Sequence, residues 1–311
     1  MILVAGGTGH LGVVLAHRLV AGGHRVRVLT RDPERARGLL DPAVELVPGD
    51  ARKAGDVRVA LEGIDSVVSA ITGFGPGAQG PRAVDHQANL ELIRAAEETG
   101  VRRFVLVSID GASRDHPMEL HRMKHLAEEA LRSSALEWVI LRPNVFMELW
   151  VEIAGGPVAE KGRATVFGRG DNPINFNSVR DVAQFAERAL TEPALARTVL
   201  SVGGPENLTF NQFVDRIGRA AGRQVSVRHV PLPLMRVTAL AMRRLKPDVA
   251  GLIEAGIAMD SAPMAFESAG LQERFPDVRL TSLQEVLERR FGATAHAART
   301  LGAVRPRPAG R

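Results

Sequence analysis

The first half of the chain alternates between short apolar runs and segments whose apolar residues recur three or four positions apart. A short apolar run bounded by turn residues is typical of a buried strand, and the wider spacing is typical of a helix with one buried face. The apolar runs predict six strands, at residues 1–6, 24–30, 44–50, 66–72, 102–109 and 137–143. The segments between them predict helices at residues 10–22, 33–40, 83–99 and 116–131, with a short one before residue 66. Strands separated by helices imply crossover connections, so we expect an α/β fold with a doubly wound parallel sheet of Rossmann type.

The second half has a looser pattern, with Gly/Pro-rich loops expected around residues 154–174. A strand is expected at residues 198–204, and helices near residues 209–221, 233–245 and 281–291. We therefore expect a Rossmann domain over residues 1–150, with contributions from about 175–203, and a smaller substrate-side lobe over mainly 151–291. Residues 292–311 are rich in Pro, Gly, Ala and Arg without apolar periodicity, which predicts a disordered basic tail.

Composition excludes several classes of protein. The chain has no cysteine, so disulfides and thiolate zinc sites are impossible. Four of the 40 Lys and Arg residues lie in the basic tail, which leaves 36 against 35 acidic residues elsewhere, so we expect no nucleic-acid partner. No stretch approaches the roughly 18 apolar residues that a membrane-spanning helix needs, and the chain opens directly on a strand-like segment. We expect a cytoplasmic protein without a membrane contact, and the pattern gives no oligomeric state.

A glycine-rich loop, GGTGHLG, follows the first predicted strand and opens the first predicted helix. Such a loop lets backbone N–H groups and the positive helix end approach a pyrophosphate without an intervening side chain. It sits inside a β-α-β unit of about thirty residues, the context that a dinucleotide-binding loop requires. The predicted contacts are Gly6, Gly7, Thr8, Gly9, His10, Leu11 and Gly12, with His10 as a neighbour of the phosphates.

The second predicted strand ends in LTRD, which places Arg31 where a ribose-reading side chain is expected. An acid there accepts a hydrogen bond from the 2′-hydroxyl of NAD, whereas a guanidinium favours the 2′-phosphate of NADP. Arg31 therefore predicts a preference for NADP(H), with NAD(H) possible. Asp32 stands one position late and either supports NAD or caps the helix that Pro33 opens.

Together these motifs resemble the atypical, NmrA-like branch of the short-chain dehydrogenase/reductase superfamily, which includes isoflavone-reductase-like and quinone-reductase-like members. The matching segments are GGTGHLG, VPGD, VSAIT, RRFVLVSIDGA, HRMKHLAEEAL, WVILRPNVFME and FNSVRDVA. The resemblance implies that Asp50 and Ala51 lie along the adenine, Ile71 and Thr72 pass the cofactor ribose, and Pro143, Asn144, Val145 and Phe146 border the nicotinamide. Asp181 matches the family's aspartate at the start of a late helix, and we interpret it as a helix cap.

In most active members of this superfamily, a serine after the fifth strand and a tyrosine four residues before a helical lysine form the catalytic set. Ser108 occupies the serine place and Lys124 the lysine place, but Leu120 stands at the tyrosine place. In the family's chemistry the lysine binds the nicotinamide ribose and lowers the pKa of the phenol, which protonates the substrate oxygen. We expect Ser108 and Lys124 to be catalytic, and the usual proton donor is missing, since the chain contains no tyrosine.

Other proton donors are conceivable near this helix. His121 and His125 stand four apart, as a metal-binding pair would, but no further ligand appears at a suitable spacing, so we predict partly exposed helix histidines and no metal site. His121 should point away from Lys124, because successive helical residues are rotated by about 100°. His116 lies two turns from the lysine, and Asp110 is either an acid with a raised pKa or an exposed turn residue.

The remaining option is that the substrate supplies its own proton or needs none. A quinone, or an aromatic ketone beside a phenol, delocalises or internally hydrogen-bonds the developing oxyanion, while Ser108 and the charge of Lys124 stabilise it. Phe146, Met147 and Trp150, together with Asp110, would suit a flat aromatic substrate, although the apolar three would equally suit an ordinary core. The glycine-dense residues 73–81 form either a lid over this site or a flexible connection.

Two functions fit these residues. The first is an NAD(P)H-dependent reductase of a ketone or quinone, with an aromatic, polycyclic, polyketide-like substrate. The second is a non-catalytic regulator that senses NADP(H), which the missing tyrosine favours. A nucleotide-sugar epimerase is disfavoured, because epimerases of that kind use the absent tyrosine. Only four lysines stand among the forty basic residues, and one of them occupies the catalytic lysine place, which favours the enzyme.

Overall fold

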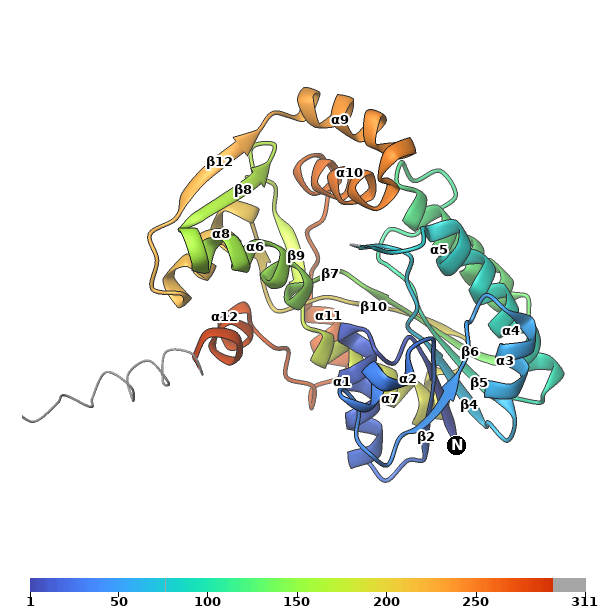
Figure 1. Cartoon of the computed structure of the whole chain (residues 1–311). Helices are drawn as coiled ribbons and strands as arrows, with labels where there is room; N and C mark the ends of the chain where they lie inside the picture. Colours follow the sequence, from blue (N-terminus) through green and yellow to red (C-terminus); the bar gives the residue numbers. More distant parts are fainter. Residues whose placement is uncertain (76, 293–311) are drawn as a thin grey trace, which may run out of the picture.

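The computed structural model describes residues 1–75 and 77–292 and has a seven-stranded parallel sheet at its centre (Figure 1). The strands are β1 (Ile2–Ala5), β2 (Val26–Thr30), β3 (Glu45–Pro48), β4 (Ser66–Ser69), β5 (Arg103–Val107), β6 (Glu137–Pro143) and β10 (Thr198–Val202). Their order across the sheet is β10-β6-β5-β4-β1-β2-β3. Each strand lies inside one of the predicted apolar runs, and the doubly wound fold is confirmed.

Helices cover both faces of the sheet, because each presents one apolar stripe to it. One hydrophobic cluster joins the sheet to α1 (His10–Ala21), α2 (Pro33–Arg37) and α7 (Val179–Thr191). A second cluster joins it to α3 (Ala54–Leu61), α4 (Asn89–Glu98) and α5 (Glu119–Arg132). The predicted helix at residues 83–99 is observed as a π-helical segment, η1 (Arg82–Ala88), that continues into α4. Both faces of the sheet are therefore buried, as a parallel sheet requires.

The second lobe has its own hydrophobic core and two small sheets. The first sheet has the order β11-β9-β7, and the second pairs β12 with β8. The strands are β7 (Val145–Phe146), β8 (Arg163–Phe167), β9 (Ile174–Asn177), β11 (Asn207–Leu208) and β12 (Ser226–Val230). Its helices are α6 (Met147–Lys161), α8 (Phe210–Ala220), α9 (Leu232–Leu245), α10 (Pro247–Ser261) and α12 (Leu283–Leu287), with the short segment η3 (Glu288–Gly292). Helix α11 (Ala269–Arg274) and the short segment η2 (Pro193–Leu195) pack instead on the cluster of the seven-stranded sheet, through Leu271 and Leu195. The core centres on stacked Phe176 and Phe213, whose ring centroids are 4.5 Å apart.

Three predictions about this half need correction. The loop expected from residue 154 onward begins only after Lys161, because α6 continues through Pro157 and buries Val151 and Val158 in the lobe core. Helix α10 was not predicted. Asp181 is not the helix cap: Ser178 caps α7, and the Asp181 carboxylate accepts hydrogen bonds from the amide and hydroxyl of Thr281 at 2.8 and 2.6 Å. The predicted basic tail, apart from Gly292, lies outside the described residues.

Candidate active site

The predicted site residues lie along one edge of the sheet, which we call the carboxyl edge: the residues that directly follow strands β6, β5, β4, β1, β2 and β3. In that order they begin with Asn144, Ser108, Ala70, Gly6, Arg31 and Gly49. The chain leaves β1 and β4 toward opposite sides of the sheet, and ligands of such folds bind where this reversal opens a crevice. A dinucleotide across this crevice would have one end near β4, β5 and β6 and the other near β2 and β3.

The glycine loop has the shape that a phosphate group needs. A Cβ atom on Gly12 would lie 2.1 Å from the carbonyl oxygen of Gly6, and one on Gly6 would lie 2.7 Å from the carbonyl oxygen of Ala70. These two glycines are required by the packing of the protein itself. A Cβ atom on Gly9 would meet no atom closer than 3.5 Å, so Gly9 instead leaves space open in front of the N-terminus of α1. Open space before the positive end of a helix fits a pyrophosphate.

His10 connects this loop to the second lobe. Its half-exposed ring has Nε2 3.1 Å from Oε2 of Glu152 on α6. The side chain therefore lies between the glycine loop and α6, and its position near the phosphates stays a prediction.

The β2–β3 end of the carboxyl edge carries exposed charges. Arg31 is exposed and, within the described residues, pairs with no carboxylate. Asp32 caps α2 by accepting a hydrogen bond of 3.0 Å from the amide of Arg35, which confirms one of its two expected roles. Asp50 pairs with Arg52, and this hydrogen bond, helped by the charge of Arg31, lowers the pKa of Asp50 to about 2. Arg31 is thus a cation without a protein partner at the predicted adenine end.

Lys124 is buried at the opposite end of the carboxyl edge. Its Nζ atom donates to the carbonyl oxygens of Ile71 at 3.0 Å and Val107 at 2.8 Å, and lies 3.1 Å from Oδ1 of Asp85. Burial raises the pKa of Asp85, and the neighbouring ammonium opposes that rise. Asp85 also accepts from the amide of Gly73 at 2.7 Å. The pair therefore fixes residues 71–73, through which the cofactor ribose is predicted to pass.

Ser108 faces Glu128, one helical turn beyond Lys124. The distance from Ser108 Oγ to Glu128 Oε1 is 2.5 Å, and both side chains are buried. Arg142 donates to Glu128 at 2.9 and 2.6 Å, and Arg132 donates at 2.8 Å. A carboxylate held by two guanidinium groups only accepts hydrogen bonds, so the hydroxyl of Ser108 must be the donor. Sequence reasoning missed both Glu128 and Asp85.

The other residues of this region lie as follows. Leu120 is buried one turn before Lys124 and offers no polar atom. His121 is also buried, not partly exposed as predicted: its ring stacks on His116 at 3.7 Å between centroids, and burial lowers its pKa to about 3. The prediction failed because it considered only the position of His121 on its own helix. It did not include the segment at His116, whose ring stacks on that of His121.

Asp110 is half-buried, and its carboxylate accepts a hydrogen bond from Ser201 at 3.3 Å. No group of three potential metal ligands occurs among residues 1–75 and 77–292.

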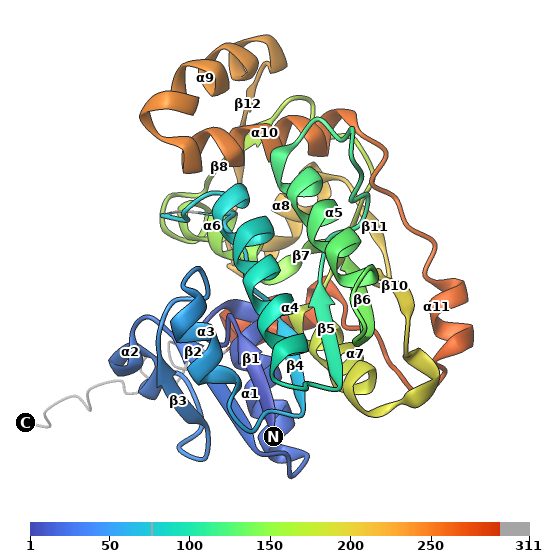
Figure 2. The same ribbon diagram turned by 90° about the vertical axis from the view of Figure 1, so that its right-hand side faces the viewer.

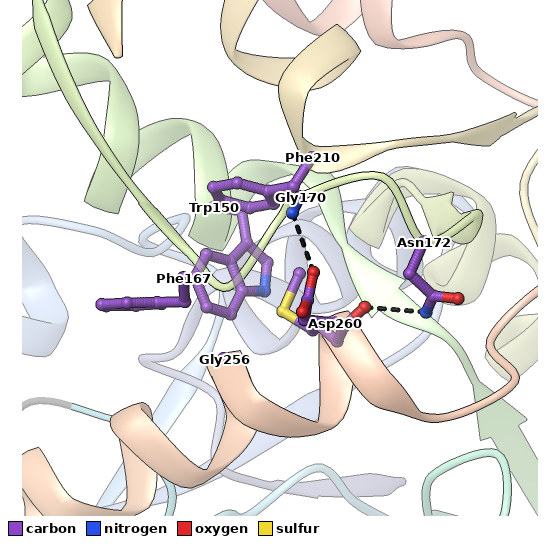
Figure 3. A pocket seen from close by; sticks show the side chains of 8 residues that line it. Trp150, Phe167, Gly170, Asn172, Phe210, Gly256 and Asp260 are labelled. Atoms are coloured by element: carbon purple, nitrogen blue, oxygen red, sulfur yellow. Dashed lines mark hydrogen bonds between the residues drawn. The ribbon is translucent and has the colours of Figure 1, made fainter. Parts of the chain in front are cut away.

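The aromatic residues predicted to contact substrate belong largely to hydrophobic cores. Phe146 packs against the sheet cluster, whereas Met147 and Trp150 lie in the core of the second lobe. Trp150 also lines a small pocket with Phe167 and Phe210 (Figure 3). Asp260 closes this pocket and accepts from the amides of residues 169 and 170 at 2.9 and 2.8 Å. The pocket has room for about one water molecule, so a flat aromatic substrate does not fit there.

The glycine-dense residues 73–81 connect the two lobes. Besides the bond from Gly73 to Asp85, the amide of Gly77 donates to Asp248 of α10 at 3.1 Å, and Phe74 packs against the core of the second lobe. The described part of the segment is thus attached at the buried lysine site and at α10.

Comparison with known proteins finds a matching family and proteins of similar sequence. Residues 6–193 match the family model described as NAD(P)H-binding. The chain is 31% identical to an NAD(P)H azoreductase of Xenophilus azovorans, over 75% of this chain and 78% of that protein. It is 28% identical to the photosystem II assembly factor Ycf39 of a Synechocystis strain, over 94% of this chain and 90% of that protein.

The fold also matches solved structures. An NADPH-dependent quinone oxidoreductase of Escherichia coli, crystallised with NADPH, superposes with a TM-score of 0.75 at 21% identity, covering 94% of this chain and 100% of that one. This likeness shows a shared fold. Within the described residues, no helix of the chain combines the length and the apolar character needed to cross a bilayer.

Proposed function

Because the chain belongs to the NAD(P)H-binding family, in the atypical, NmrA-like branch of the short-chain dehydrogenases/reductases, we propose that it is a reductase that uses NADPH to reduce a quinone or an aromatic ketone. The bound nicotinamide would supply the hydride, as it does in such enzymes. The protein would position the two reactants and shape the charge around them.

The observation that carries this proposal concerns positions 108 and 120, where most active members of the superfamily have a serine and a tyrosine. Neither position in this chain has a hydroxyl proton that is free to be donated to a substrate. Leu120 replaces the phenol, and the hydroxyl of Ser108 donates to Glu128. A simple ketone needs a proton as hydride arrives, because its alkoxide is strongly basic. A quinone delocalises the charge, and a ketone beside a phenol is hydrogen-bonded from within the substrate. Substrates of these two kinds suit the site.

Each part of the carboxyl edge has a role in this proposal. The glycine loop and the N-terminus of α1 would hold the pyrophosphate, and Arg31 would bind the 2′-phosphate, which favours NADP(H) over NAD(H). The buried pair of Lys124 and Asp85 keeps residues 71–73 in place for the ribose. Pro143, Asn144 and Val145 would border the nicotinamide, with Thr72 and Ala51 farther along the cofactor.

Ser108 would be a hydrogen-bond acceptor in the substrate complex. Its proton is directed at Glu128, so its oxygen can still accept a hydrogen bond from a hydroxyl of the reduced quinone. Lys124, on α5 like Glu128, donates to the carbonyl oxygen of Val107 at the end of β5, and its ammonium group would orient the cofactor ribose there. Both residues would thus act by orientation and charge rather than by proton transfer.

The substrate class draws support from the relatives and from the loop at residues 73–81. The azoreductase and the quinone oxidoreductase are named for flat, conjugated acceptors. Phe74 and the amide of Gly77 attach the loop to the second lobe, so it would cover such an acceptor from the side of α10. A polycyclic, polyketide-like ketone with a neighbouring phenol is the substrate we favour.

The second candidate is a regulator that binds NADP(H) without catalysis. The absence of a free hydroxyl at positions 108 and 120 favours it too, and the Synechocystis relative, which aligns with 94% of this chain, is named as an assembly factor rather than for a reaction. The two candidates share a cofactor site and differ only in turnover.

NADPH oxidation with a panel of quinones and hydroxylated aromatic ketones separates them. The proposal predicts turnover with at least one quinone or ortho-hydroxy ketone, and turnover about 10²–10³-fold slower with the corresponding ketones that lack the hydroxyl. Tight NADPH binding, measured by calorimetry, without oxidation of NADPH across the whole panel would overturn the reductase and leave the regulator.

A further inference from the structure

Helix α9 exposes an apolar stripe that no part of the described chain covers. Leu234, Val237, Leu240 and Leu245 are 57, 68, 67 and 76% exposed. Among the other large hydrophobic residues of the described chain, only Val59 is more than half exposed. Single exposed apolar residues are ordinary, but a group of four within twelve positions of one helix marks an interaction surface.

The stripe lies on the outer side of the helix. Met235 and Ala239 are buried, and α9 packs against α10, so the buried side faces the protein. At 100° per residue, the exposed leucines and valine fall on the opposite side of the helix. Both views show α9 at the end of the molecule farthest from the seven-stranded sheet, with β12 leading into it (Figures 1 and 2). The stripe can therefore meet a flat surface without obstruction from the Rossmann domain.

The charge around the stripe has one sign. Residues 216–247 contain no acidic residue and eight Lys and Arg residues. Three of these arginines pair with acids outside or at the border of the segment, namely Arg216, Arg219 and Arg243. Within the described chain, Arg236, Arg244 and Lys246 of the α9 region are exposed and pair with no carboxylate. An apolar stripe bordered by unpaired cations is complementary to an anionic, amphipathic surface.

We propose that α9 is an interfacial helix that docks this protein on the surface of an anionic lipid bilayer. The stripe would enter the headgroup region, and Arg236, Arg244 and Lys246 would contact lipid phosphates. A second copy of the chain is a poor occupant, because pairing two such helices sets like charges against each other. A protein partner is less well matched, because binding hot spots are enriched in aromatic residues and this stripe is entirely aliphatic. The proposal departs from our expectation of no membrane contact, and it does not depend on the proposed reductase activity.

Vesicle co-sedimentation tests the proposal on the full chain. Vesicles of phosphatidylcholine mixed with phosphatidylglycerol should bind the protein, and vesicles of phosphatidylcholine alone should bind it weakly. Replacing Leu234, Val237 and Leu240 together with serine should lower binding at least tenfold, because the buried apolar area is lost. Val59→Ser, an exposed substitution on α3, is the matched control and should bind as the original chain does.

The charge is tested separately. Arg236→Gln with Arg244→Gln should lower the partition coefficient about 30-fold, from about fivefold for each cation near the surface. Circular dichroism and NADPH binding should be unchanged in every variant, since these side chains are exposed. No binding to anionic vesicles, or equal binding of the serine variant and the Val59 control, would overturn the proposal. So would dimerisation in solution that the serine substitutions abolish, because the stripe would then belong to a second copy.

Discussion

The two ends of the carboxyl edge hold their polar side chains in different ways. Near β4, β5 and β6, Lys124, Asp85, Ser108 and Glu128 are buried and bound to one another or to backbone carbonyls. Near β2 and β3, Arg31 is exposed and pairs with no carboxylate of the described residues. A buried charge without its partner is costly, whereas an exposed one is not. The first end is therefore fixed by the fold, and the second can change without harming it.

This difference separates two properties of the protein. Position and charge at the reacting end depend on groups that also stabilise the fold, so substitutions there should change stability and turnover together. We propose that cofactor choice depends on the exposed cation Arg31, so substitutions there should change selectivity alone. The following variants test this separation, from the largest expected effect to the smallest.

Glu128→Ala should have the largest effect. It leaves the guanidinium groups of Arg142 and Arg132 and the hydroxyl of Ser108 without their common acceptor, so the free energy of unfolding should fall by about 3–5 kcal/mol. Urea denaturation measures this change. Glu129→Ala, on the next and exposed position of the same helix, is the control and should change stability by less than about 0.5 kcal/mol. Equal losses in the two variants would show that the buried network of Glu128 stabilises the fold no more than an exposed carboxylate does.

Lys124→Met should lower the free energy of unfolding by about 3 kcal/mol, because it leaves the carboxylate of Asp85 buried without a cation. Adding Asp85→Asn should recover part of that loss, since the amide removes the uncompensated charge. A double-mutant cycle measures the coupling between the two residues. If the second substitution adds a further full loss instead, the two side chains act independently and the pair does not fix residues 71–73.

Arg31→Asp should weaken NADPH binding about 10–100-fold and leave NADH binding nearly unchanged, because it replaces a cation facing the 2′-phosphate with a like charge. Calorimetric titration with both cofactors measures the ratio, and the denaturation midpoint should stay constant. Arg94→Asp, at an exposed position of α4, serves as the control. Equal weakening of both cofactors would remove Arg31 from the 2′-phosphate site.

His121 gives the smallest effect, through pH. Its pKa lies near 3 in the folded protein, against an ordinary value of 6.5, because burial disfavours the charged ring. As the pH is lowered, this histidine therefore binds a proton in the unfolded chain before it does in the folded protein. The free energy of unfolding falls as the pH drops from about 6.5 toward 3. Between pH 7 and pH 5 this costs about 2 kcal/mol. His121→Leu should remove most of this pH dependence, whereas His17→Leu at an exposed position should not. An unchanged slope in His121→Leu would mean that other groups cause it.

The sequence predicted those features that local pattern encodes. All seven strands of the main sheet follow from apolar runs, and the glycine spacing indicated the space in front of α1. The catalytic roles of Ser108 and Lys124 were predicted from the resemblance to the family's serine and lysine places, and they stay predictions. The contacts that give these residues their roles join positions far apart in the chain.

Glu128 and Asp85 illustrate the limit. Glu128 is separated from Ser108 by 20 positions, and Asp85 from Lys124 by 39, and both acids sit in helices where an exposed carboxylate would be ordinary. One signal was available: Glu128 is four positions after Lys124, on the helix face that meets the sheet. Helix α6 was missed because Gly155, Gly156 and Pro157 weaken the helical pattern, although the helix continues through all three.

The central claim is that the substrate supplies the hydrogen bond that the missing tyrosine would give. The direct test is the rate of NADPH oxidation with an ortho-hydroxy aromatic ketone and with its methyl ether, which keeps the ring and the reacting carbon. We predict a rate about 10²–10³-fold higher for the free phenol, the usual loss for removing one oxyanion donor. Leu120→Tyr should narrow that gap, because a phenol beside Lys124 can protonate either substrate. Equal rates for the two substrates in the unaltered protein would contradict the claim.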